Sequence, residues 1–337
     1  MHTHQISAPG FNSFTGTCLL ILAAVFSLFP QRASAQRFVD DRLVQTFDVK
    51  PGGELYVDTD RGSIEVETAR TDEVRVVVER ESYGASDADM DQLRFEFDKS
   101  GRKVSVIGRQ PERMRGRENK FRVRIKIQLP EKFDVDLNTS GGSVSVEDLD
   151  GSVTAQTSGG SMSFGRISGP VDARTSGGSI TLEESASDAH LRTSGGSISL
   201  GRVAGTVDAH TSGGSIKIDE AGADVVARTS GGRISVNEVR GAIDASTSGG
   251  SISAYISRQP KADCRLSTGG GSIEVKLDPS VKLSIDARAS GGGVRTDLPV
   301  SVRGKVERGR LAGELNGGGP MLELETSGGG IRIESIR

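Results

Sequence analysis

Hydrophobic and polar residues alternate strictly within an 18-residue repeat that recurs at constant spacing. With its first residue as position 1, positions 6 and 8 are apolar in every copy, as in Ile198 and Leu200, while positions 5 and 7 are mostly serine. This period of two predicts a short β-strand whose positions 6 and 8 face inward. Each copy begins with Thr-Ser-Gly-Gly, and the seven copies start at Thr139, Thr157, Thr175, Thr193, Thr211, Thr229 and Thr247.

A second alternating stretch fills the other half of each repeat. Positions 15 and 17 are apolar, as in Val207 and Ala209. Position 11 adds one more apolar residue in most copies, at the corner between the two strands. Ser-Gly-Gly supplies the opposite corner, where glycine permits a tight turn. Two short strands and two corners in every repeat predict one coil of a β-solenoid, an all-β fold like a parallel β-helix. The period is fixed because each residue must lie about 4.8 Å from its counterpart in the next coil.

Less regular coils extend the array in both directions. Thr268-Gly-Gly-Gly and Ala289-Ser-Gly-Gly-Gly follow at spacings of 21 residues, so three residues are added per coil. Cys264 and Leu266 then fall on inward positions, so we expect Cys264 to be a buried core residue rather than a reactive thiol. Degenerate coils precede the array and further glycine-rich motifs close the chain, at residues 51–57, 61–66, 317–320 and 326–333.

Residues 74–137 have a different pattern, with longer strands and charged outward positions. An open solenoid end would expose a strand edge, so we expect these strands to form an antiparallel sheet that caps or flanks the solenoid. The predicted organisation is a signal peptide (1–35), an N-terminal β region with degenerate coils (36–137) and a repeat solenoid (138–337). Within the solenoid the perfect 18-residue repeats occupy residues 139–264.

The N-terminus has the pattern of a targeting segment. An apolar run over residues 18–29 is followed by Pro30 and by Ala33-Ser34-Ala35, a small-residue cleavage site. A membrane-spanning helix needs about 20 apolar residues, more than this run supplies. We therefore expect a cleaved signal peptide and an exported protein, either periplasmic or secreted to the cell surface, with no transmembrane segment in the mature chain. Cys264 is then the one remaining cysteine, which excludes an intrachain disulfide.

Composition and motifs narrow the function classes. The chain has 45 glycines, no tryptophan and a formal net charge of −3, so a strongly basic nucleic-acid footprint is absent and we expect no nucleic-acid partner. No Gly-x-Ser-x-Gly elbow, His-Glu-x-x-His or phosphate loop occurs. A calcium β-roll is excluded because the stretch from Gly195 has Ile198 and Leu200 where glycine and aspartate are required. These observations predict a non-enzymatic protein without a cofactor.

Positions 5 and 7 form a candidate ligand face. Their side chains make two hydroxyl columns about 7 Å apart, with about 4.8 Å between successive coils. Such a surface can contact sugars, and the alternative is that small polar residues merely keep the sheet soluble. Lys217 and Arg233 interrupt the array. The candidate residues are Ser161, Ser163, Ser197, Ser199, Ser251 and Ser253.

Position 16 carries Asp172, His190 and Asp208 in consecutive coils, and His210 lies at position 18 of the coil of Asp208. Aligned carboxylates and imidazoles can bind a divalent transition metal. The favoured alternative is an acid column neutralised by the neighbouring arginines, so no metal site is assigned. The basic loop from Arg109 to Arg117 offers contact with anionic envelope polymers, and a solvated loop is again the favoured alternative.

Several of these motifs together resemble the bacterial family named "putative adhesin", a domain of unknown function with a β-solenoid fold. They are the heptapeptide from Phe47 to Gly53, Gly62-Ser-Ile-Glu-Val, the Thr-Ser-Gly-Gly-Ser-Ile array and the closing motifs from Asn316 and Thr326. The likeness covers roughly residues 40–337. It implies an extracytoplasmic solenoid that makes surface contacts, and it supplies no catalytic residues.

The function expected is therefore that of an adhesin-like scaffold binding at the surface or envelope, with an envelope polysaccharide or another envelope protein as partner. One alternative is a carbohydrate-active β-helix enzyme, which a cluster of acids in a groove would favour. The other is a structural or envelope-stress accessory protein that binds another protein, which exposed and unpaired terminal coils would favour.

Overall fold

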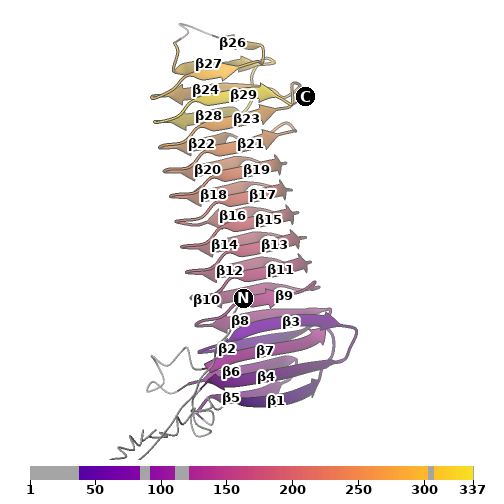
Figure 1. Ribbon diagram of the computed structural model, residues 1–337. Helices are drawn as coiled ribbons and strands as arrows, with labels where there is room; N and C mark the ends of the chain where they lie inside the picture. The colour runs from indigo at the N-terminus through magenta and orange to yellow at the C-terminus, as the bar shows by residue number, and fades with distance from the viewer. Residues whose placement is uncertain (1–37, 84–91, 111–120, 303–306, 337) are drawn as a thin grey trace, which may run out of the picture. The chain divides into compact units, whose positions relative to one another are not determined.

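The computed structural model describes residues 38–83, 92–110, 121–302 and 307–336, which fold into stacked β-strands (Figure 1). Residues 37–337 form one compact unit. The predicted signal peptide and most of the predicted basic loop lie outside the described residues. In the part of the chain that is described, no helix is long and apolar enough to cross a bilayer.

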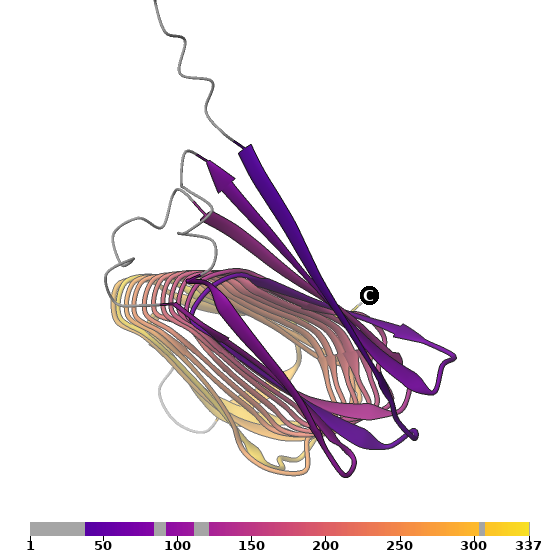
Figure 2. The ribbon, with the colours of Figure 1, turned by 90° about the horizontal axis from the view of Figure 1, so that it is seen from below.

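The strands form two long sheets that face each other across a thin core, seen end-on as a flattened ring in Figure 2. Sheet A has 14 described strands, in the order β1 (Phe38–Asp48), β4 (Glu73–Tyr83), β7 (Phe121–Pro130), β3 (Ser63–Ala69), β9 (Val144–Val146), β11 (Met162–Ile167), β13 (Ile180–Ser185), β15 (Ile198–Val203), β17 (Ile216–Ala221), β19 (Ile234–Val239), β21 (Ile252–Ile256), β23 (Ile273–Leu277), β29 (Ile331–Ser335) and β25 (Val294–Thr296).

Sheet B contributes the other strand of each coil. Its 15 described strands lie in the order β26 (Val300–Val302), β27 (Arg310–Leu315), β24 (Leu283–Ala289), β28 (Met321–Thr326), β22 (Cys264–Thr268), β20 (Ile243–Thr247), β18 (Val225–Thr229), β16 (Val207–His210), β14 (Ala189–Thr193), β12 (Val171–Thr175), β10 (Val153–Thr157), β8 (Phe133–Thr139), β2 (Gly53–Thr59), β6 (Lys103–Arg109) and β5 (Arg94–Ser100).

The register follows the sequence period. Ile180 pairs with Ile198 and Ile198 with Ile216, so each strand is parallel to its counterpart in the next repeat. Alternate residues of each repeat strand are buried, and positions 6, 8, 15 and 17 form continuous apolar columns inside the stack. The predicted fold, a β-solenoid with coils of two short strands, is confirmed. Cys264 is 1% exposed, and burial raises the pKa of its thiol.

The threonine at position 1 holds each corner together. Its side chain is buried, although it is polar. Thr193 Oγ1 donates a hydrogen bond of 2.7 Å to the carbonyl of Gly178 in the preceding coil, and it accepts one of 3.3 Å from the N–H of Gly196 in its own coil. The same two bonds recur at Thr157, Thr175, Thr211, Thr229, Thr247, Thr268 and Thr326. Each threonine therefore both closes a corner and ties two coils.

The glycine at position 4 is required by the close approach of successive corners. A Cβ atom on Gly196 would lie 2.1 Å from the carbonyl oxygen of Gly178, well inside the closest approach that real Cβ atoms make. On Gly160 it would lie 1.8 Å from the carbonyl oxygen of Gly142. The backbone of one corner thus occupies the space that a side chain on the next would need, which explains the last residue of Thr-Ser-Gly-Gly.

At the N-terminal end the chain order and the stacking order differ. The coil of β2 and β3 lies between the coil of β8 and β9 and the coil of β6 and β7, all in parallel. The stretches predicted to be degenerate coils, residues 51–57 and 61–66, contribute to β2 and β3 of this coil. The predicted N-terminal antiparallel cap is confirmed, since β1, β4 and β5 are antiparallel to their neighbours. The cap is not a separate sheet, because β6 and β7 extend the parallel stack and bury alternate residues as a coil does.

At the C-terminal end, too, the stacking order differs from the chain order. The coil that begins at Ala289 does not stack on the coil that begins at Thr268, because β28 and β29 lie between them. Thr326 donates from its Oγ1 to the carbonyl of Gly271 at 2.7 Å, repeating the corner bond of the array. Ala289 has no hydroxyl with which to make that bond. The last motif of the chain is therefore the better match for the interior place, and the earlier, weaker motif lies outside it.

Substituting the two corner glycines separately tests this packing. We expect Gly160→Ala to lower the free energy of unfolding by about 2–3 kcal/mol, because the backbone must move to admit the methyl group. The matched control is Gly159→Ala in the same corner, where a Cβ meets nothing within 4 Å. It should change stability by no more than about 1 kcal/mol. Equal denaturant midpoints for the two variants would contradict the close-approach explanation.

The threonine bond can be tested in the same way. Thr193→Val keeps the shape but leaves a carbonyl and an N–H without their partner, at an expected cost of about 1–3 kcal/mol. Thr181→Val is the control, because Thr181 is exposed on a strand of the same solenoid and makes no hydrogen bond through its side chain within the described residues. Urea unfolding should separate the two variants clearly, and a neutral Thr193→Val would show that the corner bond is dispensable.

Candidate functional site

The two hydroxyl columns of sheet A differ in what their oxygens do. At position 5, Ser161 Oγ accepts the backbone N–H of Ser179 at 3.2 Å, and Ser197 Oγ accepts that of Ser215 at 3.1 Å. Ser251 accepts from Ser272 in the same way at 3.2 Å. These three candidate residues are thus part of the contact between coils, and each keeps only its O–H and a remaining lone pair for a ligand.

The hydroxyls at position 7 face solvent without such a role. The Ser163 and Ser199 hydroxyls make no hydrogen bond within the described structure, whereas Ser253 Oγ lies 3.5 Å from Ser235 Oγ. Parallel pairing brings four such residues into one column, which ends where Lys217 pairs with Asp219 at 2.8 Å. The free hydroxyl column consists of Ser145, Ser163, Thr181 and Ser199.

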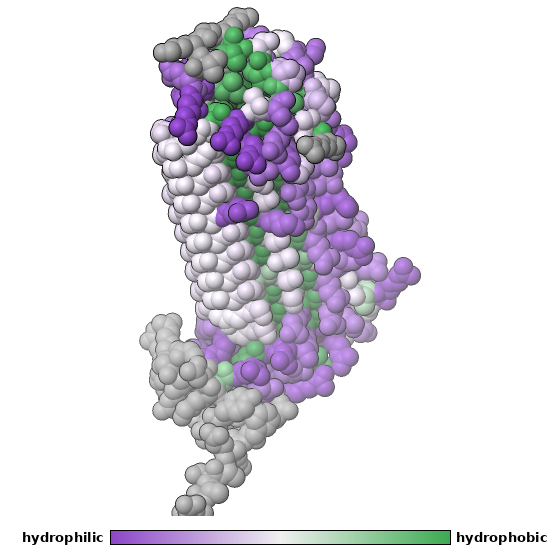
Figure 3. All heavy atoms as spheres, turned by 45° about the horizontal axis from the view of Figure 1, so that its top comes forward, coloured by the Kyte–Doolittle hydropathy of each residue, from purple (hydrophilic) through white to green (hydrophobic). Residues whose placement is uncertain are grey.

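The two edges of the stack differ in polarity. Figure 3 shows a pale, weakly polar band along one edge and a strongly polar, purple edge on the other side. Position 10 contributes to the charged edge, where Arg202 bridges Glu184 at 3.1 Å and Glu220 at 3.3 Å in the flanking coils. Hydrogen bonds from Arg166 lower the pKa of Asp148 in the same column. The charged edge is therefore internally compensated.

The columns of acids and imidazoles in sheet B have the predicted register, with His190 between Asp172 and Asp208. Asp208 is already engaged, since Arg192 lies 3.0 Å from its Oδ2 and His210 Nε2 lies 2.6 Å from its Oδ1. His190 Nδ1 is farther away, at 3.8 Å from Oδ2. Among the described residues no group of three His, Cys, Asp or Glu side chains has the arrangement needed to hold a metal ion.

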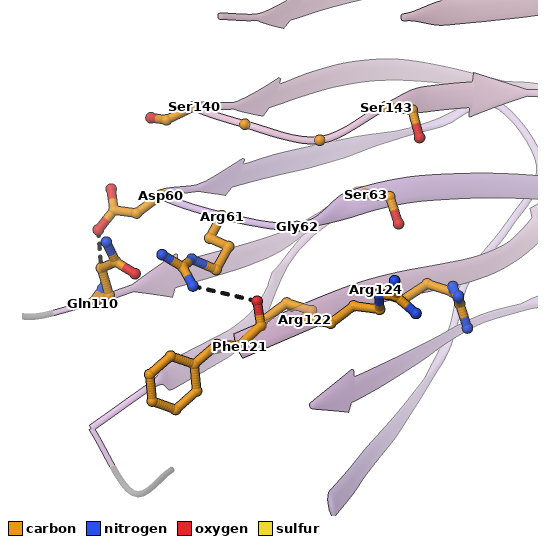
Figure 4. Close-up of a pocket in the computed structure, with 13 residues that line it drawn as sticks. Asp60, Arg61, Gly62, Ser63, Gln110, Phe121, Arg122, Arg124, Ser140 and Ser143 are labelled. Carbon is orange, nitrogen blue, oxygen red and sulfur yellow. Dashed lines mark hydrogen bonds between the residues drawn. The ribbon is translucent and has the colours of Figure 1, made fainter. Parts of the chain in front are cut away.

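A cavity of about 820 Å³ lies where the hydroxyl face meets the N-terminal cap. It is lined by the corners of three coils, and Figure 4 shows Ser63 and Ser143 in successive layers above Arg124. Arg61 Nη1 donates to the carbonyl of Phe121 at 3.4 Å, and its guanidinium lies 5.9 Å from the centre of the Phe121 ring. The position 5 column therefore ends in an arginine-lined hollow.

Charge at this end is largely balanced. Arg124 lies 3.2 Å from Glu79 and 3.5 Å from Glu65, and Lys126 lies 3.3 Å from Glu79. Burial on its own would raise the pKa of Glu79, but the hydrogen bonds from Lys126 and Arg124 bring that pKa below its ordinary value. The cavity can accommodate a polar group. Asp60 is the only carboxylate among its described lining residues.

Inspection of the sequence did not reveal the cavity. Its walls come from β2–β3, β6–β7 and β8–β9, which are neighbours only because the stacking order departs from the chain order. The one local signal was Gly62 followed by Ser63, a corner motif like that of the array.

The fold and the repeated corner agree with a known family. A family model described as Toastrack DUF4097 matches residues 53–334, from the start of β2 to the end of the last coil. The chain belongs to the Toastrack family. This confirms the family resemblance predicted from the repeats. A comparison of the Toastrack chain with curated proteins found no match.

Solved structures with detectable similarity come from other bacteria. One from Clostridium sporogenes is described as a putative cell adhesion protein, with 13% identity, a TM-score of 0.25 and coverage of 88% of this chain and 100% of its own. A putative adhesin from Bacteroides fragilis has 13% identity, a TM-score of 0.33 and coverage of 88% and 97%. A putative lipid binding protein from Parabacteroides distasonis has 15% identity, a TM-score of 0.40 and the same coverage. At these scores the descriptions remain those of the other proteins.

Zinc titration tests the acid and imidazole columns. Because Asp208 is already paired with Arg192 and His210, we expect zinc at neutral pH to leave the melting temperature unchanged. A rise of several degrees that disappears in the double variant His190→Ala, His210→Ala would instead establish a metal site on sheet B.

Proposed function

We propose that this Toastrack chain is a non-enzymatic, extracytoplasmic scaffold whose hydroxyl face binds a hydroxyl-rich polymer of the cell envelope or surface, a polysaccharide by chemical class. The observation that carries the proposal is the free hydroxyl column. Its members lie in register on successive coils, and none of their hydroxyls has a hydrogen-bond partner in the described structure.

The backbone beneath this column is fixed in advance. Corner bonds at both neighbouring coils hold each strand, so the hydroxyls lose little conformational freedom when they bind. A serine hydroxyl both donates and accepts, which suits a sugar hydroxyl in either orientation. Each contact is weak, and a polymer that spans several coils gains affinity because further contacts form intramolecularly.

The arrangement of acids supports binding over hydrolysis. Glycoside cleavage ordinarily requires two carboxyl groups that flank one bond. The position 10 acids of the described array lie in an outward column, and several are paired with arginines, as Asp148 is with Arg166 and Glu184 with Arg202. The extracytoplasmic location in this proposal rests on the apolar run over residues 18–29 and the small-residue site that follows it.

Polysaccharide binding can be tested with a face-specific variant. Purified protein would be applied to a glycan array and sedimented with peptidoglycan and with lipopolysaccharide. We expect Ser163→Lys combined with Ser199→Lys to reduce binding at least about ten-fold, because two long cations would cover the free column two coils apart.

The matched control places the same substitutions on the other sheet. Thr154→Lys combined with His190→Lys alters outward positions of sheet B at the same spacing of two coils, and a lysine at 190 places a cation near Asp208. Loss of binding in the sheet A variant alone would support the proposal. Equal loss in both variants, or no polysaccharide binding by the unmodified protein, would overturn it.

A further inference from the structure

Strand β1 leaves a long edge unpaired at one end of the solenoid. It pairs with β4 along its whole length, and in the described structure no strand pairs with its other side. The opposite end finishes in the short strands β25 and β26. Figure 2 shows β1, β4 and β7 extending past the cross-section of the coils. Proteins usually shorten or cover such edges, so a long exposed one is a site for pairing with another strand.

The orientation of the free backbone groups follows from one hydrogen bond. The N–H of Val49 donates to the carbonyl of Asp72 at 2.8 Å, in line with the register of β1 and β4. In an antiparallel pair, hydrogen-bonded residues alternate with residues whose N–H and C=O point the other way. Arg42, Val44 and Thr46 therefore direct their backbone groups to the open edge, and Asp48 does the same.

Several of the side chains on this strand are exposed and can contact a partner. Val44 is 48% exposed, one of three large hydrophobic residues exposed in the described part of the chain. Arg42 and Asp48 are both exposed, and the side chain of neither makes an ion pair or hydrogen bond within the described residues. On the other face of the strand, Leu43 and Phe47 pack only partly against the core.

We propose that β1 pairs antiparallel with β1 of a second copy of this chain, about a twofold axis at Gln45. This register places Arg42 of each copy opposite Asp48 of the other, so two ion pairs form symmetrically. It also places Leu43 opposite Phe47 and Val44 opposite Thr46, which covers the half-buried apolar side chains on one face and the exposed valine on the other. The two solenoids would join end to end, with sheet A continuous across the junction.

The charges select this register over its neighbours. In a twofold antiparallel pair, the residue numbers of any two opposing residues have the same sum. Only a twofold axis at Gln45 therefore brings Arg42 opposite Asp48. A shift of the centre to Thr46 would place Arg42 opposite Lys50, a like-charge pair. The proposal is independent of polysaccharide binding, since it uses the cap strand and leaves the hydroxyl face open.

Charge reversal and exchange test the register. Sedimentation velocity of the purified protein should show a concentration-dependent dimer. Arg42→Asp and Asp48→Arg should each weaken dimerisation at least about ten-fold, because each creates two like-charge pairs, and the exchange variant carrying both should restore it. Lys99→Glu on the neighbouring edge strand β5 is the control and should leave the dimer unchanged. A monomer at all concentrations, or an exchange variant that fails to recover, would overturn the proposal.

A cysteine cross-link provides a second readout that does not depend on the charges. At the centre of the pair Gln45 opposes itself, at a Cα separation of about 4.5 Å that is compatible with a disulfide. Gln45→Cys should therefore form a covalent dimer under mild oxidation, while Thr46→Cys, which opposes Val44, should not. The buried Cys264 does not compete. Equal cross-linking at the two positions would exclude this register.

Discussion

The structure depends on one hydrogen bond, from the threonine hydroxyl at each corner to a glycine carbonyl in the coil before. A single bond of this kind contributes about 1 kcal/mol, but it recurs at every repeated corner and each time fixes where the next coil begins. The bond brings successive corners so close that no side chain fits at position 4. The strict period of the repeat is the consequence, since a single residue added within a strand would reverse the strand faces. The longer coil before Thr268 keeps its corner bond to Gly250.

Exact stacking also determines the surface. Every outward position of the repeat forms a column, so the residue type at that position recurs on the surface of several successive coils. Small hydroxyl residues at positions 5 and 7 produce a neutral face, and acids and arginines that alternate at position 10 from Asp148 to Glu220 produce a compensated one. Neighbouring outward residues of one strand also have different roles. Ser197 satisfies the backbone of the next coil, while the hydroxyl of Ser199, two positions later, remains free.

The repeat made the coil predictable in detail. Alternation identified the inward residues, including Cys264, and the motif located the corners. The order of coils at the ends was not predictable in this way, because a corner motif states how a coil stacks but not on which neighbour. Thr326 carries a hydroxyl that Ala289 lacks, and in the place beside Thr268 this hydroxyl makes the corner bond to Gly271. The arginine-lined cavity escaped prediction for the same reason, since its walls are brought together by a reordered coil.

The insertion of β28 and β29 has a consequence for synthesis. In a solenoid stacked in chain order, each new coil can settle on the one before as it leaves the ribosome, and a shortened chain loses only its tip. Here β28 and β29, which follow β24 and β25 in the chain, occupy an inner layer between β22–β23 and β24–β25. The layer of β24 and β25 therefore lacks the strands on which it packs until β28 and β29 have been synthesised. A chain truncated before Met321 would therefore lack an internal layer of the stack. The strands β24 and β25 would then have to pack directly on β22 and β23, or would remain unpacked.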